Sequence, residues 1–313
     1  MRVLSLGAGA IGGYYGGRLI EAGADVSFLV RPERLKKLHE NGLRIESAAY
    51  GDFTAPKVQA FTAEAAKDQQ PFDIVLLTCK AYDLPSAIEA IAPFVERGAT
   101  ILPLLNGIAH LDILNARFSQ AQIWGGLAKI AATLRPDGTI QHLNDWRYIT
   151  FGAQDGTVDA RLTALKAAFD RTSVVATLAT DVMARMWEKF VHLATVASMT
   201  CLMRASVGEI ARTPLGTKLM LDMFQTMVEM AHRTGYSVSE TFQKEYHELF
   251  ANRKSGYTAS MLRDLEKGGP IEADHIIGFA NAKAVELDIN APVLAAAYTH
   301  LKAYEERRAA GRL

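Results

Sequence analysis

The sequence predicts an α/β protein in which a parallel-sheet domain, residues 1–178, is followed by an all-helical domain, residues 179–313. Three observations predict this organisation. Short apolar runs alternate with helical patterns in the first part, a glycine-rich turn follows the first run, and strand patterns cease near residue 178. Strands that are apolar on both faces and alternate with helices predict a parallel sheet covered by helices on both sides.

The parallel-sheet domain opens with two pairs of a strand and a helix. Strands are expected at Val3–Leu6 and Val26–Val30, and helices at Ile11–Glu21 and Pro32–Glu40. The series then continues with further strands and helices at Ile74–Thr78, Leu84–Val95, Thr100–Leu105, Leu111–Phe118 and Ile123–Leu127.

Two segments of this domain, Asn41–Ala55 and Gly138–Gly152, are expected to form antiparallel excursions. Tight turns join antiparallel strands, whereas parallel strands need a longer crossover. Turn-forming residues occur in or beside both segments, at Asn41-Gly42, Gly51-Asp52 and Pro136-Asp137-Gly138.

Long helical segments without strand patterns predict the second domain. They are Asp181–Arg204, Pro214–Thr234, Ser239–Phe250, Asp274–Leu287 and Pro292–Glu306. Asp181 and Ser239 are placed to cap two of these helices, and Pro214 and Pro292 suit the first turns of two others.

Composition excludes several classes of protein. Basic and acidic residues number 34 each, so no net charge attracts a nucleic acid or an anionic membrane. No apolar run approaches the roughly 18 residues of a membrane span. Cys79 and Cys201 lack CxxC spacing, and the eight histidines lack the spacing of metal ligands. We therefore expect a cytoplasmic protein without nucleic-acid, membrane or metal partners.

A glycine motif, Gly7-Ala8-Gly9-Ala10-Ile11-Gly12, lies between the first strand and the first helix. In this context Gly7 suits a tight turn, Gly9 lets a pyrophosphate approach the backbone, and Gly12 allows close packing of helix and strand. The helix that starts near Ala10 and Ile11 directs free N–H groups at the phosphates. The motif predicts a Rossmann-type dinucleotide-binding domain; the alternative is a structural glycine turn.

The residue at the end of the second strand decides between the two nicotinamide cofactors. An acidic residue there binds the ribose 2′-hydroxyl of NAD, but this strand runs into Arg31, whose guanidinium suits the 2′-phosphate of NADP. We therefore expect NADP. Glu33, two residues further on, keeps NAD as an alternative cofactor. Arg31 could also be a solvated loop charge without a role in cofactor binding.

Two polar residues follow later strands of the predicted sheet. Lys80 comes after one strand and Asn106, in Leu105-Asn106-Gly107, after the next. Open α/β sheets bind ligands at this edge, so Lys80 could reach a phosphate and Asn106 a ribose or a reacting carbonyl. Taken singly, however, Lys80 is better interpreted as a loop charge and Asn106 as part of a turn-forming Asn-Gly pair.

Together these segments resemble the ketopantoate reductase family over essentially the whole chain. The matching segments are GAGAIGG at the start, Cys79-Lys80-Ala81, Leu105-Asn106-Gly107, Met186-Trp187-Glu188-Lys189, Gly208-Glu209-Ile210, and Ser260-Met261-Leu262-Arg263-Asp264 followed by Glu272. The resemblance implies an N-terminal Rossmann domain and a helical C-terminal domain, with the active site in the cleft between them.

The resemblance also implies NADPH-dependent reduction of a 2-keto acid to a 2-hydroxy acid. Lys189 corresponds to the catalytic lysine and Glu272 to its acidic partner. Asn106 corresponds to a bridge between cofactor and substrate, Ser260 to a substrate contact, and Lys80 to a residue beside the cofactor. An ammonium group can stabilise and protonate the oxygen of a carbonyl that receives a hydride.

The chain departs from the family at two positions on the helix of the lysine. The family commonly carries asparagines four and eight residues after the lysine, where this chain has Leu193 and Ala197. That helix face is therefore apolar, unless His192 or Thr200 supplies a polar group; a structural role for His192 is the favoured interpretation. This departure favours a paralogous reductase for a related 2-keto or 3-keto acid, with ketopantoate as the second choice.

Two other functions stay open from the sequence. The chain could be a non-catalytic NADP-binding sensor, or it could be another two-domain dehydrogenase that acts on a 3-hydroxy acid or a polyol phosphate. A phosphorylated substrate requires a basic cluster, for which the helical domain offers Arg185, Arg204 and Arg263. The apolar helices are also compatible with a homodimer.

Overall fold

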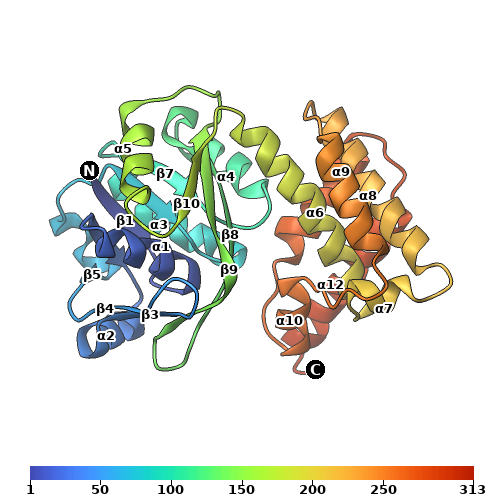
Figure 1. Cartoon of the computed structure of the whole chain (residues 1–313), viewed down its shortest axis with the longest axis horizontal. Coiled ribbons are helices and arrows are strands. Elements are labelled where there is room, and N and C mark those ends of the chain that lie inside the picture. The colour runs from blue at the N-terminus through green and yellow to red at the C-terminus, as the bar shows by residue number, and fades with distance from the viewer. The chain divides into compact units, whose positions relative to one another are not determined.

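The computed structural model describes residues 1–313. The chain forms two compact units: Met1–Leu105 with His110–Val182, and Asn106–Ala109 with Met183–Leu313. The first contains all strands and the second is helical (Figure 1), which confirms the predicted fold class. The proposed domain limit between residues 178 and 179 stays a prediction, because the loop Asn106–Ala109 groups with the second unit.

One sheet of the first unit is entirely parallel. Its strands run in the order β5-β2-β1-β6-β7. Their bounds are Gln59–Phe61 for β5, Asp25–Leu29 for β2, Arg2–Leu6 for β1, Ile74–Leu77 for β6 and Thr100–Pro103 for β7. Leu6, the last residue of β1, pairs in register with Leu29 and Leu77, so the loops after these three strands leave the same edge. The sequence did not predict β5, which has only three residues.

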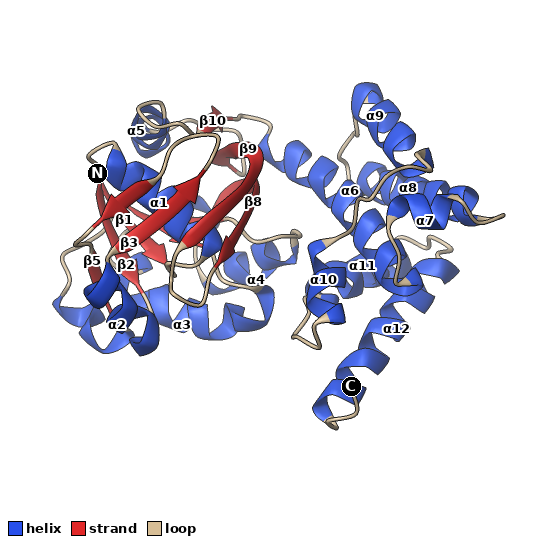
Figure 2. Cartoon of the chain, turned by 60° about the horizontal axis from the view of Figure 1, so that its bottom comes forward, coloured by secondary structure: helices blue, strands red, loops and turns tan.

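A second sheet lies beside the first, and Figure 2 shows the strands of both in red. Four strands run in the order β10-β9-β3-β4, and β8 pairs with β9. Their bounds are Val175–Leu178 for β10, Ile140–Ala153 for β9, Leu43–Ser47 for β3, Phe53–Ala55 for β4 and Trp124–Leu134 for β8. The predicted antiparallel excursions are confirmed, because β3 pairs antiparallel with β4 and β8 with β9.

One strand prediction was wrong. Ile123–Leu127 was expected to continue the parallel series, but this segment opens β8, whose partner is the antiparallel strand β9. Only an isolated parallel bridge between Ile123 and Ile101 links it to the first sheet. A short apolar run has the same pattern in either sheet. The turn at Pro136-Asp137-Gly138, which joins β8 to β9, decides its partner.

Helix α1 (Ala10–Glu21) packs against both sheets. Two of its glycines make this possible: a Cβ on Gly16 would lie 2.8 Å from the ring of Phe28 on β2, and one on Gly17 would lie 2.6 Å from Ile45 on β3. The other helices of this part of the chain are α2 (Pro32–Asn41), α3 (Leu84–Val95), α4 (Ala109–Arg117), α5 (Ala160–Phe169) and the short 3₁₀ helices η1 (Ala63–Asp68), η2 (Ala81–Asp83) and η3 (Gln120–Gln122).

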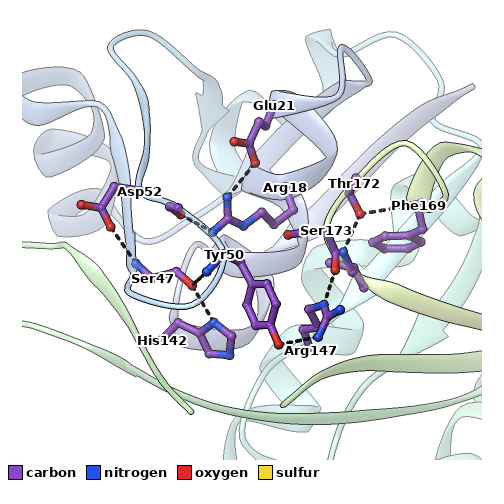
Figure 3. A network of polar contacts seen from close by, with 12 residues as sticks. Arg18, Glu21, Ser47, Tyr50, Asp52, His142, Arg147, Phe169, Thr172 and Ser173 are labelled. Atoms are coloured by element: carbon purple, nitrogen blue, oxygen red, sulfur yellow. Dashed lines mark hydrogen bonds and ion pairs between the residues drawn. The ribbon is translucent and has the colours of Figure 1, made fainter. Parts of the chain in front are cut away.

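A polar network fastens α1 to the second sheet (Figure 3). The guanidinium of Arg18, 1% exposed, donates to the Glu21 carboxylate at 2.7 Å and to the Gly51 carbonyl at 2.7 Å. Nearby, the Ser47 hydroxyl lies 3.0 Å from Nδ1 of His142, whose pKa burial lowers. The two Nη atoms of Arg18 and Nδ1 of His142 thus have polar partners, among them Ser47 at the end of β3 and Gly51 in the turn after it, which gives the network a structural role.

The second unit consists of helices α6 (Val182–Met203), α7 (Val207–Ala211), α8 (Gly216–Arg233), α9 (Glu240–Ala251), α10 (Ser260–Glu266), the π-helical turn η4 (Asp274–Gly278), α11 (Phe279–Glu286) and α12 (Pro292–Ala309). Ser239 caps α9 and Pro292 opens α12, as predicted. Pro214 was expected in the first turn of its helix, but it lies in the turn before α8. None of the helices is both long and apolar enough to cross a lipid bilayer.

Candidate functional site

The glycine motif forms a tight loop between β1 and α1. Gly7 has φ +95 and its N–H donates to the Leu29 carbonyl at 2.8 Å. A Cβ on Gly12 would lie 2.4 Å from both the Gly7 carbonyl and the Thr78 hydroxyl. The Thr78 hydroxyl in turn donates to the Leu6 carbonyl at 2.8 Å. Gly7 and Gly12 thus have the conformational and packing roles that the sequence predicted for them.

Gly9 differs from these two glycines, because a Cβ added there would meet no atom within 4 Å. Gly9 is the N-cap of α1, no side chain caps this helix, and its first turn holds no acidic residue. The first N–H groups of an α-helix have no partner within the helix, and the helix dipole is positive at this end. The open space beside Gly9, at the helix end that begins with Ala10 and Ile11, fits a phosphate group.

Arg31 lies at the N-terminus of α2, close to the carboxyl end of β2. Its guanidinium is 76% exposed and forms a 2.8 Å ion pair with Asp83, which the sequence analysis did not single out. Asp83 ends η2, and the N-cap of η2 is the exposed Lys80. The structure therefore brings Arg31 to the loop that carries Lys80. Glu33 is exposed in the first turn of α2.

A second group of polar side chains lies within the helical unit. Lys189 on α6 donates from Nζ to Oδ1 of Asn106 at 3.4 Å. Burial lowers the pKa of Lys189 to about 8, and the negative charge of Glu272 partly opposes this shift. Lys189, Asn106 and Glu272, which the sequence proposed as site residues, are thus neighbours in space although they are far apart in sequence.

A turn at Gly268 precedes Glu272, the acidic neighbour of Lys189. Gly268 has φ +71, and Glu272 lies four residues later, two residues before η4, where its carbonyl accepts a 3.2 Å hydrogen bond from the Ile276 N–H. The Glu272 side chain is 8% exposed. A buried carboxylate needs a partner, and the nearby Lys189 ammonium supplies the opposite charge.

His275 belongs to the same group and was not predicted. It is 9% exposed, and its ring donates to the backbone carbonyl of Asn106. A Cβ on Gly107 would lie 3.1 Å from the ring, so the imidazole packs directly on the Asn106-Gly107 turn. Burial lowers the pKa of His275, which keeps the ring neutral near pH 7. The only sequence signal is its position three residues after Glu272.

The face of α6 beyond Lys189 is apolar, with Leu193 half-buried and Ala197 fully buried. His192 does not change this face, because its Nε2 lies 3.0 Å from the Tyr257 hydroxyl and its ring stacks on the Tyr257 ring. The Thr200 hydroxyl donates to the carbonyl of Val196 at 2.6 Å. Both side chains therefore have structural partners. Ser260 is the half-buried first residue of α10, and its contact with substrate stays a prediction.

Residues 3–156 match the family model described as Ketopantoate reductase PanE/ApbA. Residues 181–305 match the model described as Ketopantoate reductase PanE/ApbA C terminal. The chain belongs to the ketopantoate reductase family. The ketopantoate reductase family comprises NAD(P)-dependent oxidoreductases acting on CH–OH groups, so this chain is an enzyme of that class.

Individual members extend the comparison. The chain is 33% identical over 308 residues to the uncharacterized oxidoreductase YkpB of Bacillus subtilis, spanning 98% of this chain and 100% of YkpB. The crystal structure of 2-dehydropantoate 2-reductase from Geobacter metallireducens matches with a TM-score of 0.85 and 28% identity, covering 97% of this chain and 99% of that one. D-Mandelate dehydrogenase, solved with NADH and anilino(oxo)acetate, shares the fold with a TM-score of 0.84, 18% identity and coverage of 98% and 99%.

Proposed function

We propose that this enzyme reduces the carbonyl of a 2-keto acid to a hydroxyl group with NADPH. The single observation that carries the proposal is the arrangement of Lys189, whose ammonium lies 3.4 Å from the Asn106 amide oxygen and near the Glu272 carboxylate. A family of oxidoreductases acting on CH–OH groups needs a proton donor at the reacting oxygen, and this lysine supplies one.

Each side chain has a distinct task in the reaction. A nicotinamide cofactor, when bound, supplies the hydride. Lys189 stabilises the negative charge that develops on the carbonyl oxygen and donates a proton to it from Nζ. A pKa of about 8 makes this ammonium a better acid than an ordinary lysine. Glu272 favours the charged form of Lys189, and Asn106 accepts one of its hydrogen bonds, which orients the remaining N–H groups.

NADPH is the proposed cofactor because Arg31 occupies the position near the end of β2. Its guanidinium is exposed and can form paired hydrogen bonds with a phosphate. NADH, which D-mandelate dehydrogenase binds, is the alternative, and Glu33 is the acidic residue that favours it.

The proposed substrate carries an apolar group next to the keto acid, and ketopantoate is the second choice. Leu193 and Ala197 follow Lys189 at intervals of one helical turn, so they share its side of α6. A site built from hydrogen-bonding groups selects a hydroxylated substrate strongly, whereas an apolar site gains nothing from the hydroxyl.

Two other functions receive less support. Arg185 and Arg204 lie near opposite ends of α6, roughly 30 Å apart at 1.5 Å per residue, so Arg185, Arg204 and Arg263 cannot together form one phosphate site. This weighs against a polyol phosphate as substrate. A non-catalytic sensor would not require a half-buried lysine beside a buried carboxylate, because removing both charges from water is costly. A homodimer stays a prediction.

The test compares two acids that differ by one hydroxyl group, ketopantoate and trimethylpyruvate, in assays of NADPH oxidation. The wild-type enzyme should show the higher kcat/KM with trimethylpyruvate. Leu193→Asn should shift the ratio of the two kcat/KM values toward ketopantoate. A higher kcat/KM of the wild-type enzyme with ketopantoate would contradict the proposed substrate class, and turnover of neither acid nor any other 2-keto acid would contradict the proposed reaction.

A further inference from the structure

Arg34 on α2 links the glycine loop to the turn between β8 and β9. Its Nε donates to the Ala8 carbonyl at 2.9 Å, and its Nη1 donates to the Gly138 carbonyl at 3.0 Å. Its Nη2 is buried and has no hydrogen-bond partner. Ala8 is the second residue of the glycine motif and is 1% exposed. A cation therefore lies against the backbone of the loop that fits a phosphate.

The contact with Ala8 fixes the orientation of one peptide group. In a trans peptide the C=O and the following N–H point in opposite directions. Because the Ala8 carbonyl points to Arg34, the Gly9 N–H of the same peptide group points away from Arg34. Gly9 is the N-cap of α1 and has open space beside its Cα. A rotated peptide would present a carbonyl oxygen to a phosphate in place of an N–H donor.

Arg34 also contacts the turn between β8 and β9. Gly138 has φ +90, and a Cβ there would lie 2.5 Å from Nη1 of Arg34. Two more basic residues hold the same turn, since Lys37 donates to the Pro136 carbonyl at 3.0 Å and Arg44 forms a 3.2 Å ion pair with Asp137. The turn therefore has anchors of its own, and Arg34 is the one among these three that also contacts the glycine loop.

The positive charge of Arg34 also favours an anion beside the glycine loop. Both of its acceptors are neutral carbonyl groups, and burial lowers its pKa while Asp137 partly opposes the shift. A guanidinium stays charged in proteins, so its positive charge is only partly compensated. An anion that binds beside the glycine loop would reduce this imbalance.

We propose that Arg34 is a positioning residue for the dinucleotide site, which holds the peptide between Ala8 and Gly9 with its N–H directed at the bound pyrophosphate. This proposal rests on the proposed use of a dinucleotide cofactor. It differs from the proposed role of Arg31, because the pyrophosphate is common to NADPH and NADH whereas the 2′-phosphate is not.

Dissociation constants of the cofactors test this role. Arg34→Met should raise the Kd of NADPH and of NADH by a similar factor of roughly 10, because the pyrophosphate contact is common to both cofactors. Lys37→Met is the matched control: it removes another anchor of the same turn and should change both values less than about 2-fold. Arg34→Lys keeps the charge and one set of donors, so it should restore part of the affinity.

Three outcomes would overturn the proposal. Unchanged Kd values in Arg34→Met would remove any role in cofactor binding. A loss confined to NADPH would assign Arg34 to the 2′-phosphate. An equal loss in Lys37→Met would assign the effect to the turn.

Amide hydrogen exchange without cofactor tests the positioning separately. The N–H groups of Gly7 and Gly13 donate to the carbonyls of Leu29 and Gly9, so they report on the loop. They should exchange faster in Arg34→Met and at the wild-type rate in Lys37→Met, and unchanged exchange in Arg34→Met would overturn the proposal. If the wild-type protein bound neither dinucleotide, the proposed function would fail, and exchange would still decide whether Arg34 holds the loop.

Discussion

Nζ of Lys189 lies 3.4 Å from Oδ1 of Asn106, in a setting that lowers the pKa of the lysine to about 8. Burial causes this shift, and the Glu272 carboxylate limits it. An ordinary lysine holds its proton too firmly to be an effective acid near neutral pH. The contact therefore joins the two properties that a proton donor needs, a fixed position and a suitable pKa.

The rate of reduction should consequently depend on pH. Only the protonated form of Lys189 can donate, so kcat/KM should be constant below pH 8 and fall about tenfold per pH unit above it. Glu272→Gln removes the charge that raises this pKa, and the fall should then begin at a lower pH. Initial rates across this range check both expectations. A flat profile up to about pH 10, or a shift to higher pH in Glu272→Gln, would rule out Lys189 as the proton donor.

Two glycines of the loop should respond differently to the same substitution. Gly12→Ala places a Cβ 2.4 Å from the Gly7 carbonyl, and such overpacking typically costs about 1–3 kcal/mol of the free energy of unfolding. Gly9→Ala meets no atom within 4 Å, so stability should stay nearly unchanged, whereas the Kd of NADPH should rise at least ~10-fold because the methyl group occupies the phosphate space. Thermal unfolding and fluorescence titration measure the two effects. Unaltered NADPH binding in a stable Gly9→Ala variant would show that the space beside Gly9 holds no cofactor.

The ion pair between Arg31 and Asp83 should influence the choice of cofactor. Arg31→Ala should raise the Kd of NADPH by roughly 10-fold and leave that of NADH within a factor of about 2, since only NADPH carries the 2′-phosphate. Asp83→Asn releases Arg31 from an exposed ion pair, so NADPH should bind up to about 5-fold more tightly. Titrations of both variants with both cofactors provide the comparison. Equal losses for NADPH and NADH in Arg31→Ala would contradict the proposed preference for NADPH.

Much of the fold could be predicted because local patterns determine it. The helix Leu84–Val95 has the predicted bounds, and turn residues correctly indicated the antiparallel excursions. The apolar segment Ile123–Leu127 was assigned to the wrong sheet, because its pattern does not identify the partner strand. The position of α1 against both sheets depends on Gly16 and Gly17, whose significance appears only when their neighbours Phe28 and Ile45 are known.

Fewer residues of the candidate site than elements of the fold could be predicted from the sequence. Lys189 lies on α6 and Glu272 in the loop before η4, and only the family resemblance singled them out. His275, Asp83 and Arg34 went unnoticed, since each is an ordinary residue until its partner is seen. A histidine near a candidate carboxylate and an arginine one turn after Arg31 were the only local signals for two of them.

Substitution of Lys189 distinguishes a proton donor in the reduction from a residue that only supports the fold. Lys189→Met should bind NADPH within about 2-fold of the wild-type Kd while its kcat falls at least ~100-fold, the usual contribution of a general acid. Lys218→Met, which removes an exposed lysine of the same helical unit, should leave both values unchanged. Wild-type turnover in Lys189→Met would show that another group protonates the substrate.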